Sequence, residues 1–246
     1  MPNQCQCDPN CKHVPLENSP FCNVHMGKNK CKRISPLTGR EPRYEPNKYN
    51  DMNRIRGSHN CFAYAFDYMD IPSEDECTDK KCNINFHQPG IKSGFPKWNK
   101  TRGKRCPDLL SRLRGDVHGI QRAEFTERCP PQSSKIALVV SPENDYHFFR
   151  QDSNGLWSHK PGALPVTNLD ADNRPIYDPA LANRHYQSAV NDIDYNQFCT
   201  YLCVPKGGRP FKFKRGGCGR RQTQRKKGKS VKLTRKARTC MSKRNV

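Results

Sequence analysis

The chain has 246 residues, 14 cysteines, 33% hydrophobic residues and a formal net charge of +21. This hydrophobic content is below that of an ordinary compact domain, which excludes one core running through the whole length. No stretch approaches the roughly 20 apolar residues of a membrane-spanning helix, and no hydrophobic run near the N-terminus resembles a secretory signal. We therefore expect no membrane span and a reducing compartment, in which clustered cysteines more often bind metals or catalyse reactions than form disulfides.

Composition divides the chain into three parts. Residues 1–50 are rich in Cys, His and Pro and lack apolar periodicity, so something other than a core must order them. Residues 51–205 contain the apolar runs and predict the globular domain. Residues 206–246 hold 17 of the 44 Lys and Arg residues and no acid, so we expect a basic, disordered tail.

The N-terminal part contains seven candidate metal ligands, which are Cys5, Cys7, Cys11, His13, Cys22, His25 and Cys31. Zinc takes four N or S ligands, often as close pairs separated by a loop. Cys22 and His25 form one such pair, and Cys7 and Cys11 are the natural second pair. We predict a structural zinc module with these four ligands, with Cys5, His13 and Cys31 as substitutes. The phrase Phe-Cys-x-x-His resembles short zinc modules in proteins of large DNA viruses.

The domain begins with a predicted buried helix over residues 61–69, which is rich in Ala and aromatic residues. Asn60 is a suitable N-cap for this helix. Residues 73–107 are interrupted by Pro and Gly and look irregular. A short helix is expected over residues 109–113.

Strands are predicted in the second half of the domain, over 135–141, 146–151 and 156–160. Turns between them indicate an antiparallel meander. A helix is expected around residues 181–190, and residues 198–204 form a closing strand. These elements predict an α+β fold, in which a helix carrying Cys61 packs on an antiparallel sheet.

Cys61 opens its helix, where the partial positive charge of the helix N-terminus lowers the pKa of a thiol. A nucleophilic thiol also needs a base, and a third group to orient that base. If Ser153-Asn154-Gly155 is a three-residue hairpin, Phe149 pairs with His159. His147 then lies on the same face as His159 and diagonal to it. We predict Cys61 as nucleophile, His147 as base and His159 as orienting group, with Asn168 and Asp170 as its rivals.

This chain order resembles that of papain-like cysteine hydrolases, and the second histidine makes it similar to the NlpC-type cell-wall peptidases. The resemblance covers roughly residues 51–205. It implies a peptidase, amidase or acyltransferase that acts on a peptide or acyl substrate. The papain-type glutamine is missing, since Arg54-Ile55-Arg56 stand before the cysteine. The oxyanion donor is therefore left open among the Cys61 backbone N–H and the side chains of Asn53, His59 and Asn60.

The basic tail predicts an acidic partner. A polycation binds nucleic acid by releasing counterions, without reading its sequence. An acidic capsid surface is the alternative partner, and a nuclear localisation signal is the simpler interpretation. The candidate nucleic-acid contacts are Arg220, Arg221, Arg225, Lys226, Lys227 and Lys229.

Three functions follow from these features. The first is a thiol hydrolase packaged in a virion. The second is a catalytically inactive virion structural protein, such as a minor capsid or cement protein, on the same fold. The third is a nucleic-acid packaging protein that acts through its tail. The expected location is the virion or the host cytoplasm, or the nucleus if the tail directs the chain there.

Overall fold

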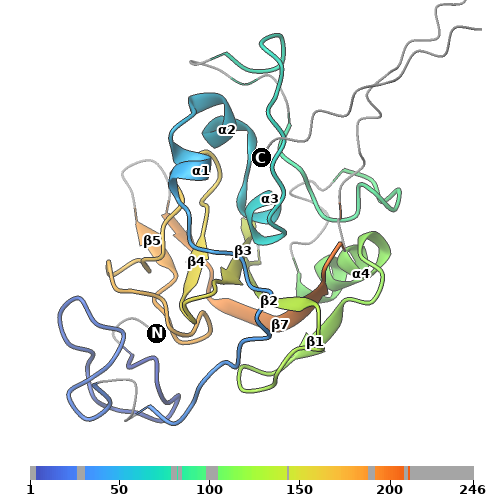
Figure 1. Cartoon of the computed structure of the whole chain (residues 1–246). Coiled ribbons are helices and arrows are strands. Elements are labelled where there is room, and N and C mark those ends of the chain that lie inside the picture. The colour runs from blue at the N-terminus through green and yellow to red at the C-terminus, as the bar shows by residue number, and fades with distance from the viewer. Residues whose placement is uncertain are drawn as a thin grey trace, which may run out of the picture. The chain divides into compact units, whose positions relative to one another are not determined.

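The computed structural model describes residues 4–26, 31–78, 82, 85–97, 105–142, 144–187, 192–207 and 210. Its helices are α1 (Asn47–Asn50), α2 (Asn53–Ser58), α3 (Cys61–Ala65) and α4 (Cys106–Asp116). Its strands are β1 (Gln121–Ala123), β2 (Ser133–Ser141), β3 (Asp145–Gln151), β4 (Trp157–His159), β5 (His185–Gln187), β6 (Asp192–Asp194) and β7 (Gln197–Pro205). The described residues combine helices with antiparallel strands, which confirms the predicted α+β class (Figure 1).

The main sheet has the strand order β1-β7-β2-β3-β4, and all neighbouring strands are antiparallel. Strands β2, β3 and β4 form the predicted meander, and β7 is the predicted closing strand. Because β7 lies between β1 and β2, the last of the described strands is an internal strand of the sheet. Strands β5 and β6 pair with each other in a separate hairpin.

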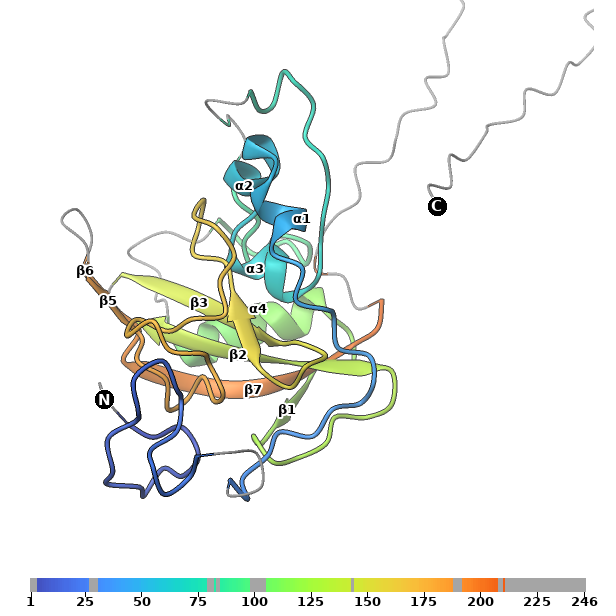
Figure 2. The ribbon, with the colours of Figure 1, turned by 60° about the vertical axis from the view of Figure 1, so that its left-hand side comes forward.

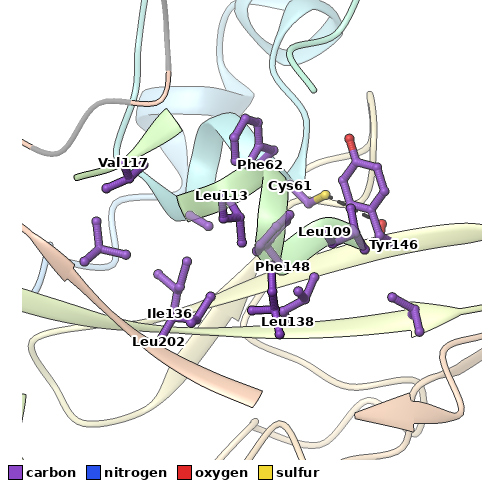
Figure 3. Packing of buried hydrophobic residues seen from close by; sticks show 14 of the residues in the cluster. Cys61, Phe62, Leu109, Leu113, Val117, Ile136, Leu138, Tyr146, Phe148 and Leu202 are labelled. Carbon is purple, nitrogen blue, oxygen red and sulfur yellow. Dashed lines mark hydrogen bonds between the residues drawn. The ribbon is translucent and has the colours of Figure 1, made fainter. Parts of the chain in front are cut away.

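One face of the main sheet, which we call the helix face, packs against α3 and α4 (Figure 2). Ile136 and Leu138 of β2 and Phe148 of β3 pack there with Leu109 and Leu113 of α4. Figure 3 shows these side chains pointing into one shared core. The short helix that we predicted is longer than expected and begins at Cys106, because a proline suits the first turn of a helix.

The opposite face of the sheet, which we call the loop face, is covered by irregular segments that follow β4. Ala137 and Val139 of β2, Phe149 of β3 and Trp157 of β4 pack there with Ile176 from one of these segments. Both faces of β2 are therefore covered, and every residue of this strand after its first two is buried. This explains why β2 has a continuous apolar run in place of an alternating pattern.

The predicted hairpin register between β3 and β4 is confirmed. Phe149 pairs with His159. The backbone N–H of Asp152 donates to the carbonyl of Leu156 at 2.9 Å, which closes the three-residue turn. Gly155 has a φ of 86°, the left-handed conformation that such a turn requires and that glycine adopts without a steric penalty.

Two of the expected helices differ from the structure. The helix expected over residues 61–69 ends at Ala65, and Asp67 then adopts a φ of 48°. The helix expected around residues 181–190 is wrong, because the chain forms the extended strand β5 there. The buried Arg184 side chain donates to the Tyr195 carbonyl at 3.0 Å, next to the β5–β6 hairpin. Tertiary pairing thus overrides local helix propensity at this point.

Eight of the cysteines that the structure describes form disulfides, which are Cys7–Cys31, Cys77–Cys82, Cys106–Cys199 and Cys129–Cys203. The expectation that the clustered cysteines are ligands or catalytic thiols is therefore wrong for these residues. Cys106 ties α4 to β7, and Cys129 ties the segment before β2 to the same strand. Among the described residues, the free thiols are Cys5, Cys11, Cys22 and Cys61.

Candidate functional site

Cys61 lies at the first position of α3, as the sequence predicts. The side-chain oxygen of Asn60 accepts the backbone N–H of Ala63 at 3.1 Å, so Asn60 is the N-cap of this helix. The amide nitrogen of Asn60 donates to the His87 carbonyl at 2.9 Å. The cap fixes the start of α3, and with it the position of the Cys61 sulfur, which lies 4.0 Å from the Tyr146 carbonyl oxygen (Figure 3).

The two predicted histidines are hydrogen-bonded to each other. His147 Nε2 and His159 Nδ1 are 2.8 Å apart, and His159 Nε2 lies 3.0 Å from the Leu169 carbonyl oxygen. A carbonyl only accepts, so His159 Nε2 carries the proton that it donates to Leu169. In a neutral His159 the Nδ1 atom must then accept from His147 Nε2–H. This leaves the lone pair of His147 on Nδ1, which is the atom that a general base would use.

Of the three candidates for the orienting group, His159 is the one whose side chain lies within hydrogen-bond distance of His147. The carboxylate of Asp170 instead accepts the backbone N–H groups of Asp172 and Arg174, at 2.9 and 3.0 Å. Asn168 pairs through its backbone carbonyl with Ile176, at 2.9 Å.

Cys61 and His147 line the same cavity, which has a volume of about 390 Å3. Asn60, Asp145 and Tyr195 also line this cavity, and the Tyr195 hydroxyl donates to the Asp145 carboxylate at 3.3 Å. Sequence reasoning did not identify Asp145 or Tyr195 as site residues, because neither belongs to the motif. A thiol and an imidazole that share a cavity have the components for acyl transfer.

Burial governs the ionisation of these groups. Burial, followed by the negative charge of Asp145, raises the pKa of Cys61 to about 12. Burial also lowers the pKa of His147 well below its usual range, with a further contribution from His159. Burial lowers the pKa of His159 to about 4. At neutral pH the resting site therefore holds a protonated thiol and two neutral imidazoles.

A second group of potential ligands lies in the N-terminal segment and could hold a metal ion. The ligand atoms of Cys5, Cys11, Cys22 and His25 all lie within 4.8 Å of one another. The His25 Nδ1 atom is 3.5 Å from the Cys5 sulfur and 3.4 Å from the Cys22 sulfur. Three of the four predicted zinc ligands are thus brought together.

Cys7 is the exception among the predicted ligands. Its sulfur is bonded to that of Cys31, so it cannot act as a thiolate ligand, and Cys5 takes its place in the group. His13, another expected substitute, is exposed and lies outside the group. The spacing of the cysteines favours Cys7 over Cys5 as the partner of Cys11, so spacing selects the wrong residue here.

The predicted nucleic-acid contacts lie outside the described residues. They are Arg220, Arg221, Arg225, Lys226, Lys227 and Lys229. Among the residues that the structure describes, no helix is both long enough and apolar enough to cross a membrane.

Comparisons with known proteins give one clear similarity. The chain is 34% identical to insoluble matrix shell protein 1 of Ruditapes philippinarum over 142 residues. The aligned part covers 58% of this chain and 81% of that protein. No family model matches the chain, and no solved structure matches it.

Proposed function

We propose that this chain, which belongs to the family of insoluble matrix shell protein 1, is a structural component of an insoluble extracellular matrix. The family relationship carries this proposal. It favours the second function predicted from the sequence, a structural protein, over the thiol hydrolase. The assembly that the protein belongs to is then a matrix rather than a virion.

The disulfides support an extracellular setting. Disulfides form and persist in oxidising compartments, and they are rare in the cytosol. Two of them fasten distant parts of the chain to β7, across 93 and 74 residues. Cross-links over such long loops suit a protein that must keep its fold in an assembly outside the cell.

Fractionation of the native tissue tests the matrix proposal. An antibody against the chain is expected to detect it in the residue that resists both detergent and chelator. The same antibody should label extracellular material in tissue sections. Detection only in the soluble intracellular fraction would contradict the proposal.

A zinc ion in the N-terminal segment fits this role. Three thiolates and one imidazole are a donor set typical of structural zinc sites, in which all four positions are filled by the protein. Coordination would also protect Cys5, Cys11 and Cys22 from oxidation in a disulfide-forming compartment. We infer that this group binds zinc, the metal that the sequence predicts.

Thiol acyl transfer is the second candidate function, and the 2.8 Å contact between His147 and His159 favours it. In this reaction the Cys61 sulfur would attack an amide or ester carbonyl carbon. Its proton would pass to His147 and then to the departing amine or alcohol, and water would release the acyl group. The resemblance to papain-like, NlpC-type hydrolases supports this candidate.

Alkylation of Cys61 distinguishes the two candidates. With its pKa raised to about 12, Cys61 is expected to react with iodoacetamide more slowly than a free peptide thiol at neutral pH. The rate should increase with pH as the thiolate fraction grows. Mass spectrometry of the modified peptide measures this rate at Cys61 alone, and the Cys61→Ala variant identifies the signal. A reaction faster than that of the free thiol would favour acyl transfer over a purely structural role.

A further inference from the structure

Gln6 is a polar residue that the N-terminal segment inserts into the rest of the fold. It is 1% exposed. Its side-chain oxygen accepts the backbone N–H groups of Tyr177 and Asp178, at 2.7 and 3.0 Å. Its amide nitrogen donates to the carboxylate of Asp170 at 3.2 Å. Both ends of the amide are thus used by residues more than 160 positions away in sequence.

The residue before Gln6 is a potential metal ligand, and the residue after it is disulfide-bonded. Cys5 belongs to the group that could hold a metal ion, and Cys7 is bonded to Cys31. Gln6 therefore lies between a potential metal ligand and a disulfide. Phe21, next to the ligand Cys22, packs edge-on against Tyr177 with ring centroids 4.7 Å apart. The side chains that contact the domain thus lie directly beside the potential ligands.

The N-terminal segment has little else to keep it in this conformation. Among the described residues, positions 4–26 contain no helix or strand. The buried cluster of this segment consists of Cys5, Cys7, Cys22 and Cys31. A segment with so little apolar surface depends on its cross-links for order, and small metal modules of this kind unfold when the ion is removed.

The residues that Gln6 contacts are connected to His159, the hydrogen-bond partner of His147 in the cavity with Cys61. Asp170, which accepts from Gln6, also accepts the backbone N–H of Asn183 at 3.2 Å. The preceding residue, Leu169, provides the carbonyl that accepts from His159 at 3.0 Å. The segment that Gln6 holds is therefore the same segment that fixes the His159 ring.

We propose that a zinc ion held by Cys5, Cys11, Cys22 and His25 keeps Gln6 seated in the fold, and so orders the segment 169–178 behind His159. This proposal rests on the zinc inference made above and adds the role of the ion. The bound zinc keeps the N-terminal segment docked on the rest of the fold. It stabilises the irregular segments that cover the loop face, although the zinc ligands themselves do not belong to the sheet.

Hydrogen exchange of the full chain tests this role. The purified protein is expected to contain one zinc ion per chain. Removal of the ion with a chelator should speed exchange of the Tyr177 and Asp178 amides by about tenfold or more, as expected when their hydrogen bonds to Gln6 are lost. The amides of β2, which do not contact the N-terminal segment through Gln6, serve as the internal reference.

Variants separate metal binding from docking. Gln6→Ala should speed exchange of the same two amides while the zinc content stays at one. Cys22→Ser should lose the zinc and speed exchange as the chelator does. His13→Ala, which changes a histidine outside the ligand group, should alter neither quantity.

Two results would overturn the proposal in different ways. Loss of zinc without faster exchange at Tyr177 and Asp178 would refute the role of the ion in docking Gln6 and leave the zinc inference intact. A purified chain that contains no zinc, and acquires none on incubation with it, would refute both. Neither result bears on the matrix role, which the tissue fractionation tests separately.

Discussion

Replacing Arg150 with alanine is expected to lower the free energy of unfolding by about 3–5 kcal/mol, the usual cost of removing one partner from a buried ion pair. Arg150 and Asp152 are 2% and 1% exposed, and their side chains are 3.0 Å apart. The same guanidinium donates to the Arg43 carbonyl at 3.0 Å and stacks over the Tyr64 ring at 3.9 Å. The substitution leaves the Asp152 carboxylate buried without this partner.

Urea denaturation of the wild type and variant measures this loss. Lys48→Ala is the matched control, since Lys48 pairs at 3.6 Å with Asp67, a second partner of Arg150, and the side chains of Lys48 and Asp67 are 40% and 46% exposed. Such a pair contributes less than about 1 kcal/mol. Equal losses in the two variants would contradict the buried-pair argument.

The Arg150→Ala variant should also depend on pH in a defined direction. Burial already raises the pKa of Asp152, and removal of the favourable Arg150 charge raises it further. The folded state then binds a proton more readily than the unfolded state. Stability of the variant relative to the wild type is therefore lowest at neutral pH, and part of it returns as the pH falls.

Loss of the Cys106–Cys199 disulfide should cost about 4–5 kcal/mol, because the bond closes a long loop and restricts the unfolded chain. The two cysteines are 93 residues apart and join α4 to β7. The double Cys→Ala variant, compared with the wild type by chemical denaturation, measures this effect.

The Cys77–Cys82 disulfide is the natural control, since it spans only 5 residues. The same chain-entropy argument predicts a cost of about 2 kcal/mol for its removal. The order of the two losses is the decisive result. A larger loss for the Cys77–Cys82 variant would show that loop length does not govern the contribution of these bonds.

The sequence predicted the parts of the fold that local chemistry specifies. Gly155 supplies the left-handed position of a three-residue turn, and that turn fixes the pairing of Phe149 with His159. From this register alone, His147 and His159 could be placed side by side. The N-cap role of Asn60 was predictable for the same reason, since it depends on neighbouring residues.

The features of the fold and of the site that could not be predicted depend on contacts between distant parts of the chain. The spacing to Cys11 favours Cys7 as a ligand, but Cys7 is bonded to Cys31 and Cys5 joins the ligand group, a choice that depends on how the segment folds back on itself. The pairing of Cys106 with Cys199 likewise requires knowledge that α4 packs beside β7. The pKa of Cys61 could not be predicted either, because it follows from burial rather than from position at a helix start.

The internal position of β7 sets an order for folding during synthesis. Until residues 197–205 emerge from the ribosome, β1 and β2 have no strand between them, and the sheet stays in two pieces. Cys106 and Cys129 likewise cannot form their native disulfides before then, because both of their partners lie on β7. Sheets assembled from such distant pairings form slowly. A chain halted before this strand would therefore display unpaired sheet edges and reactive thiols, the features that chaperones and disulfide isomerases recognise.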